Sequence, residues 1–152
     1  MIVGEDAPYP ARARTRPDES SETAVLDLVG DVPPLSEVRQ WTGEVLADLG
    51  DEEVTDAKLV ASELVTNAYE HGRHPLHLRL RRARDLIRIE VVDLSPRMPV
   101  VGRSSVRVTR GRGMVLVDQL CSQWGALRHA VGKTVWAVLA LSSRQPDRGL
   151  PA

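Results

Sequence analysis

The stretch Ser62–Gly72, SELVTNAYEHG, ends a helical segment that begins at Asp51. At about 100° per residue, one compact stripe of this helix is apolar and is made of Ala57, Val60, Ala61, Leu64 and Ala68. Glu63, Asn67 and Glu70 follow one line along the edge of that stripe. We therefore predict that these three side chains line a groove beside the core. Polar residues are common at such boundaries, and the geometry alone leaves that simpler interpretation open.

Periodicity on both sides of this helix indicates a sheet that is covered by helices. The predicted strands cover residues 23–30, 75–82 and 86–93, with a final hairpin over residues 125–141 that turns at Gly132 and Lys133. Further helices are predicted over residues 33–50 and 114–125. Because helices and strands are grouped instead of strictly alternating, we expect an α/β protein of the α+β two-layer sandwich kind, with a mostly antiparallel sheet and helices on one face. The last strand is apolar on both faces, which predicts a central position.

Composition and charge limit the classes of function. The formal net charge is −1, so no overall basic field favours direct binding of nucleic acid or of a membrane surface. No segment reaches the roughly 20 apolar residues that span a bilayer, and a single cysteine cannot form an intramolecular disulfide, so we expect a cytoplasmic protein. Cys121 falls on an apolar helix face, which favours a core residue over a nucleophile. The pattern predicts a disordered leader over 1–21, one domain over 22–142 and a flexible tail over 143–152.

Three features further along the chain point to a ligand site. Asp93 ends the apolar strand LIRIEVVD, where its carboxylate would emerge at the mouth of the sheet. The segment TRGRGMVLV predicts a loop leading into a helix, in which Gly111 and Gly113 let backbone N–H groups approach an anion. Thr134 stands at the entry to the last strand, GKTVWAVLAL. Each feature is common by itself, and their order and spacing are much less common.

This ordered set resembles the histidine-kinase-like ATPases, or GHKL superfamily, and within it the free-standing anti-sigma factor serine/threonine kinases. The resemblance covers residues 23–141 and implies a Bergerat-type ATP-binding fold with ATP and Mg²⁺ as ligands. By the match of ASELVTNAYEHG to the N-box of the family, Asn67 would coordinate Mg²⁺ and Glu63 would be the general base or a carboxylate that orients water. Mg²⁺ prefers oxygen ligands and is often held by one or two protein groups together with phosphates, which suits a lone Asn carbonyl.

The resemblance also assigns the nucleotide contacts. Asp93 would accept a hydrogen bond from the adenine amino group, and Thr134 would support the adenine side of the pocket through Asp93. Phosphates would be held by backbone N–H groups of the glycine box, namely Gly111, Arg112, Gly113 and Met114.

The sequence departs from the family where Asp-x-Gly-x-Gly is expected and DLSPR stands instead. Ser95 and Arg97 fill the two glycine positions, and Pro96 stiffens the turn. The following lid, residues 98–110, is short. Arginines that could neutralise phosphate charge are Arg103, Arg107, Arg110 and Arg112, and the pattern does not select one of them. The adenine contact is kept, while mobility of the lid and turnover are placed in question.

Three functions follow from these observations. The first is an ATP-dependent kinase that phosphorylates a Ser or Thr of a small anti-sigma antagonist protein and sequesters a sigma factor or similar target. The second is a catalytically inactive switch that binds a protein partner with or without nucleotide. The third, an interaction domain without nucleotide, requires the Glu63–Asn67 line, Asp93 and the glycine segment to be coincidental. Kinases of this type are often homodimers, so a homodimer is one expected assembly.

Overall fold

The computed structural model describes residues 22–71, 75–94 and 108–142, and the side chains of residues 108–113 are not among the described atoms. The elements are β1 (Glu22–Asp27), α1 (Leu35–Val45), α2 (Asp51–His71), β2 (His77–Arg82), β3 (Leu86–Asp93), α3 (Val108–Leu120), β4 (Gln123–Arg128) and β5 (Lys133–Ala140). The leader over 1–21, the tail over 143–152, the box residues Ser95, Pro96 and Arg97 and the lid as far as Arg107 lie outside the described residues.

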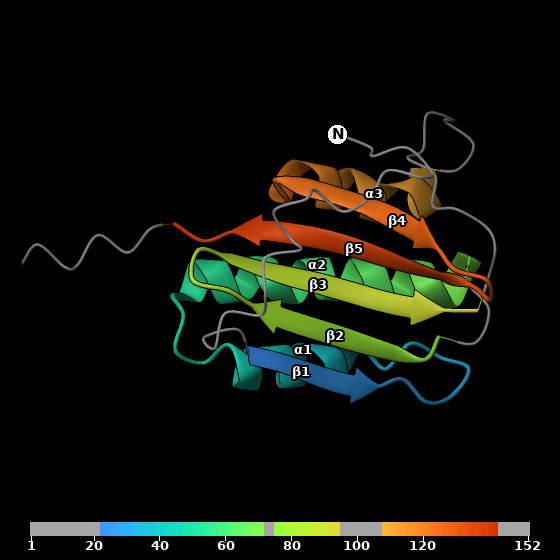
Figure 1. The fold of residues 1–152 in the computed structure, drawn as a ribbon, viewed down its shortest axis with the longest axis horizontal. Coiled ribbons are helices and arrows are strands. Elements are labelled where there is room, and N and C mark those ends of the chain that lie inside the picture. Colours follow the sequence, from blue (N-terminus) through green and yellow to red (C-terminus); the bar gives the residue numbers. More distant parts are fainter. Residues whose placement is uncertain (1–21, 72–74, 95–107, 143–152) are drawn as a thin grey trace, which may run out of the picture.

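The five strands form one sheet in the order β1-β2-β3-β5-β4. Every neighbouring pair is antiparallel. The helices lie together on one side of this sheet, as Figure 1 shows. The predicted two-layer sandwich is therefore confirmed. The interior position predicted for the last strand is also confirmed, since β5 lies between β3 and β4 and only its last residue is exposed.

Helix α2 is the centre of the helical layer. It contacts α1, α3, β3 and β5. The apolar stripe predicted from its sequence is buried in full, with Ala57, Val60, Ala61 and Leu64 at 0% exposure and Ala68 at 2%. Burying one Val or Leu side chain contributes about 1.5–3 kcal/mol, so this stripe fixes how α2 is rotated on the sheet.

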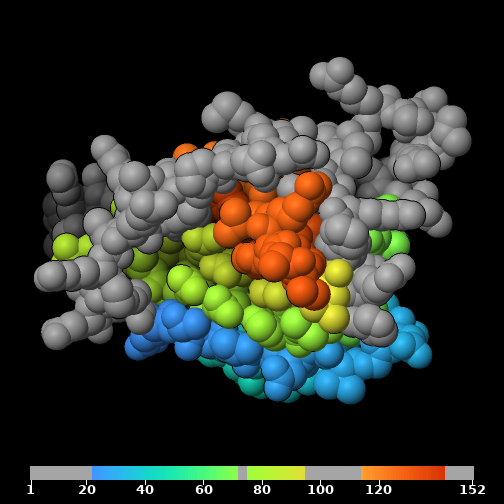
Figure 2. All heavy atoms as spheres, turned by 45° about the vertical axis from the view of Figure 1, so that its right-hand side comes forward, coloured from blue at the N-terminus to red at the C-terminus, as the bar shows by residue number. Residues whose placement is uncertain are grey.

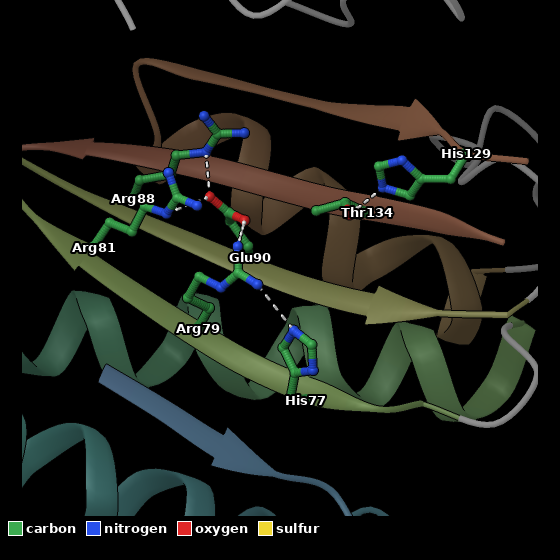
Figure 3. Close-up of polar contacts among 7 residues, drawn as sticks. All are labelled: His77, Arg79, Arg81, Arg88, Glu90, His129 and Thr134. Carbon is green, nitrogen blue, oxygen red and sulfur yellow. Dashed lines mark hydrogen bonds and ion pairs between the residues drawn. The ribbon is translucent and has the colours of Figure 1, made fainter. Parts of the chain in front are cut away.

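Side chains on the opposite face of the sheet form a charged cluster around Glu90 (Figure 3). Arg88 Nε lies 2.9 Å from Glu90 Oε1, Arg81 Nε lies 3.4 Å from the same oxygen, and Arg79 Nη1 lies 3.5 Å from Oε2. The Arg88 contact is short but is not aligned as a hydrogen bond, so it is an ion pair. Arg88 also stacks over Trp136, at 5.2 Å from the ring centroid. Because side chains alternate along a strand, this cluster is separated from the helix-covered core.

The bounds of two helices differ from the sequence prediction. Helix α1 ends at Val45 and not at residue 50, and the next residue, Leu46, is its C-cap and is fully buried. Helix α3 was expected over 114–125 but covers Val108–Leu120, and Trp124 belongs to β4. Trp124 is held there because its Nε1 donates to Asp118 Oδ1 at 2.8 Å and its ring is buried. Within the described ranges, no helix is both long and apolar enough to cross a membrane.

Candidate functional site

The elements that carry the predicted site residues meet at one end of the molecule. The C-terminal end of α2, the end of β3, the start of β5 and the start of α3 all lie on the right-hand side of Figure 1. Helix α2 packs against β3, β5 and α3, which brings these ends together although they are far apart in the sequence. The structure thus gathers the C-terminal end of α2, the strand-end Asp93 and the start of α3 around one region.

The polar line of α2 runs from the half-buried Glu63 through the buried Asn67 to the exposed Glu70. Asn67 is 7% exposed. Burial raises the pKa of the Glu63 carboxyl above its ordinary value of 4.5, and the negative charge of Glu70 adds to that effect. A carboxylate with a raised pKa holds an abstracted proton better, which suits a general base. The groove-edge position predicted for these residues is consistent with this gradient of burial.

Asp93 is the last residue of β3 and is completely buried. Its register partner on β5 is Lys133, which is 1% exposed. Lys133 Nζ lies 3.1 Å from Asp93 Oδ1 and donates a hydrogen bond to it. The carboxylate that was predicted to receive adenine therefore has an internal ammonium partner.

Lys133 was missed by the sequence reasoning, which treated it only as a turn residue. Two signals could have found it. It is the only charged residue of the strand KTVWAVLA, and its alternation with Val135 and Ala137 places it on the core side. A lysine in the core needs an acidic partner, and Asp93 is the buried acid at the matching end of β3.

Thr134 is not brought together with Asp93. It alternates to the other side of β5, where its Oγ1 and His129 Nε2 are 2.7 Å apart, as Figure 3 shows. The register pairs Thr134 with Val92 and pairs Asp93 with Lys133. A shift by one residue along a strand reverses the face, so the side chain that supports Asp93 is Lys133.

The segment that contains Gly111 and Gly113 is helical, so the prediction of a loop there was wrong. Helix α3 begins at Val108 and contains both Gly111 and Gly113. An α-helix leaves only its first four N–H groups without partners inside the helix, and Gly111 is the fourth residue of α3. The N–H groups of Arg112, Gly113 and Met114 therefore fall within the hydrogen-bonded part of the helix. The Met114 side chain is 1% exposed and packs in the core.

A close backbone contact fixes the geometry around Asp93. Gly132 has a φ of +85°, and a Cβ placed on it would overlap the Asp93 carbonyl oxygen and lie 2.6 Å from Leu94 Cα. Figure 2 shows the result, since the orange atoms of the β4–β5 hairpin lie against the yellow atoms at the end of β3. The turn predicted at Gly132 and Lys133 is confirmed for Gly132 only, since Lys133 is already the first residue of β5.

Two surface hollows of the described chain lie in other parts of the fold. One surface hollow is lined by residues of the α2 N-terminus and the end of β5, among them Glu52 and Leu141. Another is lined by residues of β1, α1 and the β2–β3 turn, among them Asp48 and Arg84. No group of three or more His, Cys, Asp or Glu side chains able to hold a metal occurs among residues 22–71, 75–94 and 114–142. An Mg²⁺ ion at Asn67 would thus depend on phosphate and water oxygens for its other ligands.

Comparison with known protein families identifies the domain. The model of the histidine kinase-like ATPase domain matches residues 31–139, which is more than half of the chain. The chain belongs to the histidine kinase-like ATPase family. Membership in this ATPase family implies that the domain binds ATP. No curated protein matches the chain. The match to the ATPase model begins after β1 and contains α2, Asp93 and Lys133.

Proposed function

We propose that this ATPase-family domain is a regulatory protein kinase of the anti-sigma factor type, which transfers phosphate from Mg-ATP to a Ser or Thr of a small antagonist protein. The observation that carries the proposal is that α2, which carries Glu63 and Asn67, packs against β3, which ends at Asp93, and that both elements have their C-terminal ends at the same side of the domain. A nucleotide held there by its base at Asp93 would direct its phosphates toward α2 and the start of α3.

Glu63 is the proposed general base. It would take the proton of the attacking hydroxyl, while the oxygen of that hydroxyl forms a new bond to the γ-phosphorus and the bond from phosphorus to the ADP oxygen breaks. The raised pKa of Glu63 supports this role, because the carboxylate gains basicity from its burial and from the nearby Glu70. Asn67 is the proposed protein ligand of Mg²⁺, which would neutralise charge on the phosphates.

The proposed partners are proteins. The resemblance to anti-sigma factor kinases indicates an anti-sigma antagonist protein, a sigma factor, or both. A second copy of the chain is a further proposed partner. The near-zero net charge supports a role without direct contact to nucleic acid.

A second function is favoured by one specific observation, the buried pair of Asp93 and Lys133. A carboxylate already bound to an ammonium is a poorer acceptor for adenine, and weak nucleotide binding would leave a protein-binding switch without catalysis. In that case partner binding would respond to ATP or ADP, or to neither, and no phosphate would be transferred.

The deciding experiment measures binding and transfer separately. Thermal unfolding with Mg-ATP, Mg-ADP and Mg-GTP reports binding, since a ligand at 100 times its Kd adds about 2.7 kcal/mol of stability. Transfer of label from [γ-³²P]ATP to a purified antagonist protein reports catalysis. For a kinase, Glu63→Ala abolishes the label and leaves ATP affinity within a few fold, and Asn67→Ala weakens Mg-ATP binding. Label that survives Glu63→Ala contradicts the role of Glu63, and ATP-dependent partner binding without label supports the switch.

A further inference from the structure

Three arginines meet on the face of the sheet opposite the helices, around one shared glutamate. Arg79, Arg81 and Arg88 each have a nitrogen within 3.5 Å of a carboxylate oxygen of Glu90, as Figure 3 shows. Glu90 offsets one of these three charges, so this group, called here the arginine cluster, has two positive charges in excess. Positive charges that share one carboxylate repel one another, which favours the binding of a further negative group.

We propose that the acidic end of the leader, Asp18 and Glu19, binds the arginine cluster and holds the leader across this face of the sheet. The leader lies outside the described residues, and the proposal concerns only where its acidic end is held. The inference goes beyond the proposed kinase function and does not rest on it, because Glu90 and Asp93 lie on opposite faces of β3.

Two apolar side chains of β5 are buried on the same face as the cluster. Trp136 is 2% exposed and Val138 is 7% exposed, and they alternate with Val135 and Ala137, which belong to the helix-covered core. The described helices lie on the other side of the sheet, as Figure 1 shows, and Arg88 stacks over the Trp136 ring. A large apolar side chain on a sheet face is buried to this degree when a layer covers it. A leader held at the cluster would complete that layer.

Charge selects the leader among the longer stretches outside the described ranges. Residues 95–107 contain three arginines and no acidic residue, and residues 143–152 contain two arginines and one aspartate. Neither stretch would relieve the positive excess. Residues 17–21, PDESS, carry two carboxylates and no basic group, and all the arginines of the leader precede them. This acidic end is therefore electrostatically complementary to the arginine cluster.

The strand register places the acidic end within reach of the cluster. The leader ends where β1 begins, Thr23 of β1 is opposite Arg81, and Arg81 is opposite Arg88. The two arginines lie about 5 and 10 Å from the β1 backbone, while the chain from Glu19 to Thr23 can span roughly 13 Å. Arg81 contacts the shared glutamate through Nε, and its side chain is 49% exposed. Its terminal N–H groups can thus meet a carboxylate from outside.

The experiment measures acrylamide quenching and the emission wavelength of tryptophan fluorescence in the full chain. The test variant combines Asp18→Asn with Glu19→Gln. The matched control combines Glu5→Gln with Asp6→Asn, at the other acidic pair of the leader. Loss of the contact uncovers Trp136, so in the test variant the quenching constant should rise and the emission should shift to longer wavelength. The control should keep the wild-type values.

Two further variants connect the signal to the proposed contact. In a Trp136→Phe background the effect of the test variant should be lost, because Trp41 and Trp124 pack in or against the helix-covered core. Arg81→Gln should raise the quenching constant as the test variant does. Combining it with the test variant should add nothing further, since both changes remove the same contact.

Three results would overturn the inference. If the test variant leaves the quenching constant unchanged, its two carboxylates do not hold the leader on the sheet. An equal effect of the control variant would show that Asp18 and Glu19 are not the binding groups. If Trp136 of the wild-type protein is quenched as readily as in urea, the face is uncovered and is available to an acidic segment of another protein instead. None of these results bears on ATP binding, which thermal unfolding with nucleotides tests separately.

Discussion

Gly132 lies against the carbonyl group of Asp93 so closely that no side chain fits between them, and its φ of +85° is one that L-residues rarely adopt. This contact joins the β4–β5 hairpin to the strand end that carries the candidate base-binding carboxylate. The position of Lys133 beside Asp93 depends on it, since Lys133 follows Gly132 directly in the chain. A turn residue thus helps to determine the geometry of the candidate site.

The first prediction concerns this contact. Gly132→Ala should lower the free energy of unfolding by about 3 kcal/mol or more, because the change adds both backbone strain and an overlap with Asp93 and Leu94. Gly30→Ala is the matched control, since Gly30 has a φ of +94° but no atom within 4 Å of the added Cβ. It should cost only the strain, about 1 kcal/mol. Urea unfolding of both variants checks this, and equal losses would show that the contact is unimportant.

The second prediction concerns Glu90, which lies on the face of the sheet opposite the helices. Glu90→Gln should destabilise the fold by about 1–3 kcal/mol, because the buried charge that compensates three arginines is lost. Asp48→Asn is the control, since Asp48 pairs with Arg82 at 2.6 Å but is largely exposed. Exposed pairs contribute about 0–1 kcal/mol. Denaturation in low and high salt measures both, and a loss for Glu90→Gln as small as that for Asp48→Asn would contradict the prediction.

Much of the fold could be predicted because local patterns and tertiary packing agree. The apolar residues from Ala57 to Ala68 recur with the period of a helix, and burial of that helix face against a sheet satisfies all of them at once. The apolar β5 had to be an interior strand for the same reason. The ends of α1 and α3 were misplaced because tertiary contacts decide them. Trp124 was predicted to lie in the helix, yet its hydrogen bond to Asp118 and the pairing of β4 with β5 hold it in a strand.

Predictions for the candidate site likewise succeed where local patterns decide a position and fail where tertiary contacts decide it. The places of Glu63 and Asn67 beside the buried stripe of α2 and of Asp93 at the end of β3 could be predicted because they follow from periodicity and from strand ends, while the roles of these residues stay predictions. Thr134 was placed beside Asp93 although it faces His129, because register at a strand entry depends on where the turn ends. The glycines of α3 suggested a loop, since glycine has a low helix propensity, but packing of α3 against α2 overrides that preference.

The third prediction concerns Cys121, which packs against the core as the sequence indicated. Burial, with the negative charges of Asp56 and Asp118, raises the pKa of its thiol to about 12 from an ordinary 9.0. Because the thiolate is the reactive form, the native thiol should react with iodoacetamide at pH 8 about a thousandfold more slowly than the thiol of the unfolded chain. Labelling with and without urea measures the ratio. Rapid labelling of the native protein would mean that Cys121 is accessible and is not part of the core.

The fourth prediction follows from the raised pKa of Glu63. Since the folded state holds the Glu63 proton more tightly than the unfolded state, its contribution to stability is fully present below pH 4.5 and is lost as pH rises through the folded pKa. Glu63→Gln cannot ionise, so its stability relative to the wild type should increase over that range and stay constant above it. The increase should be smaller in a Glu70→Gln background, because the charge of Glu70 supplies part of the shift. Denaturation midpoints from pH 4 to pH 8 give the comparison, and a difference independent of pH would show that ionised Glu63 is fully solvated and is not tuned as a base.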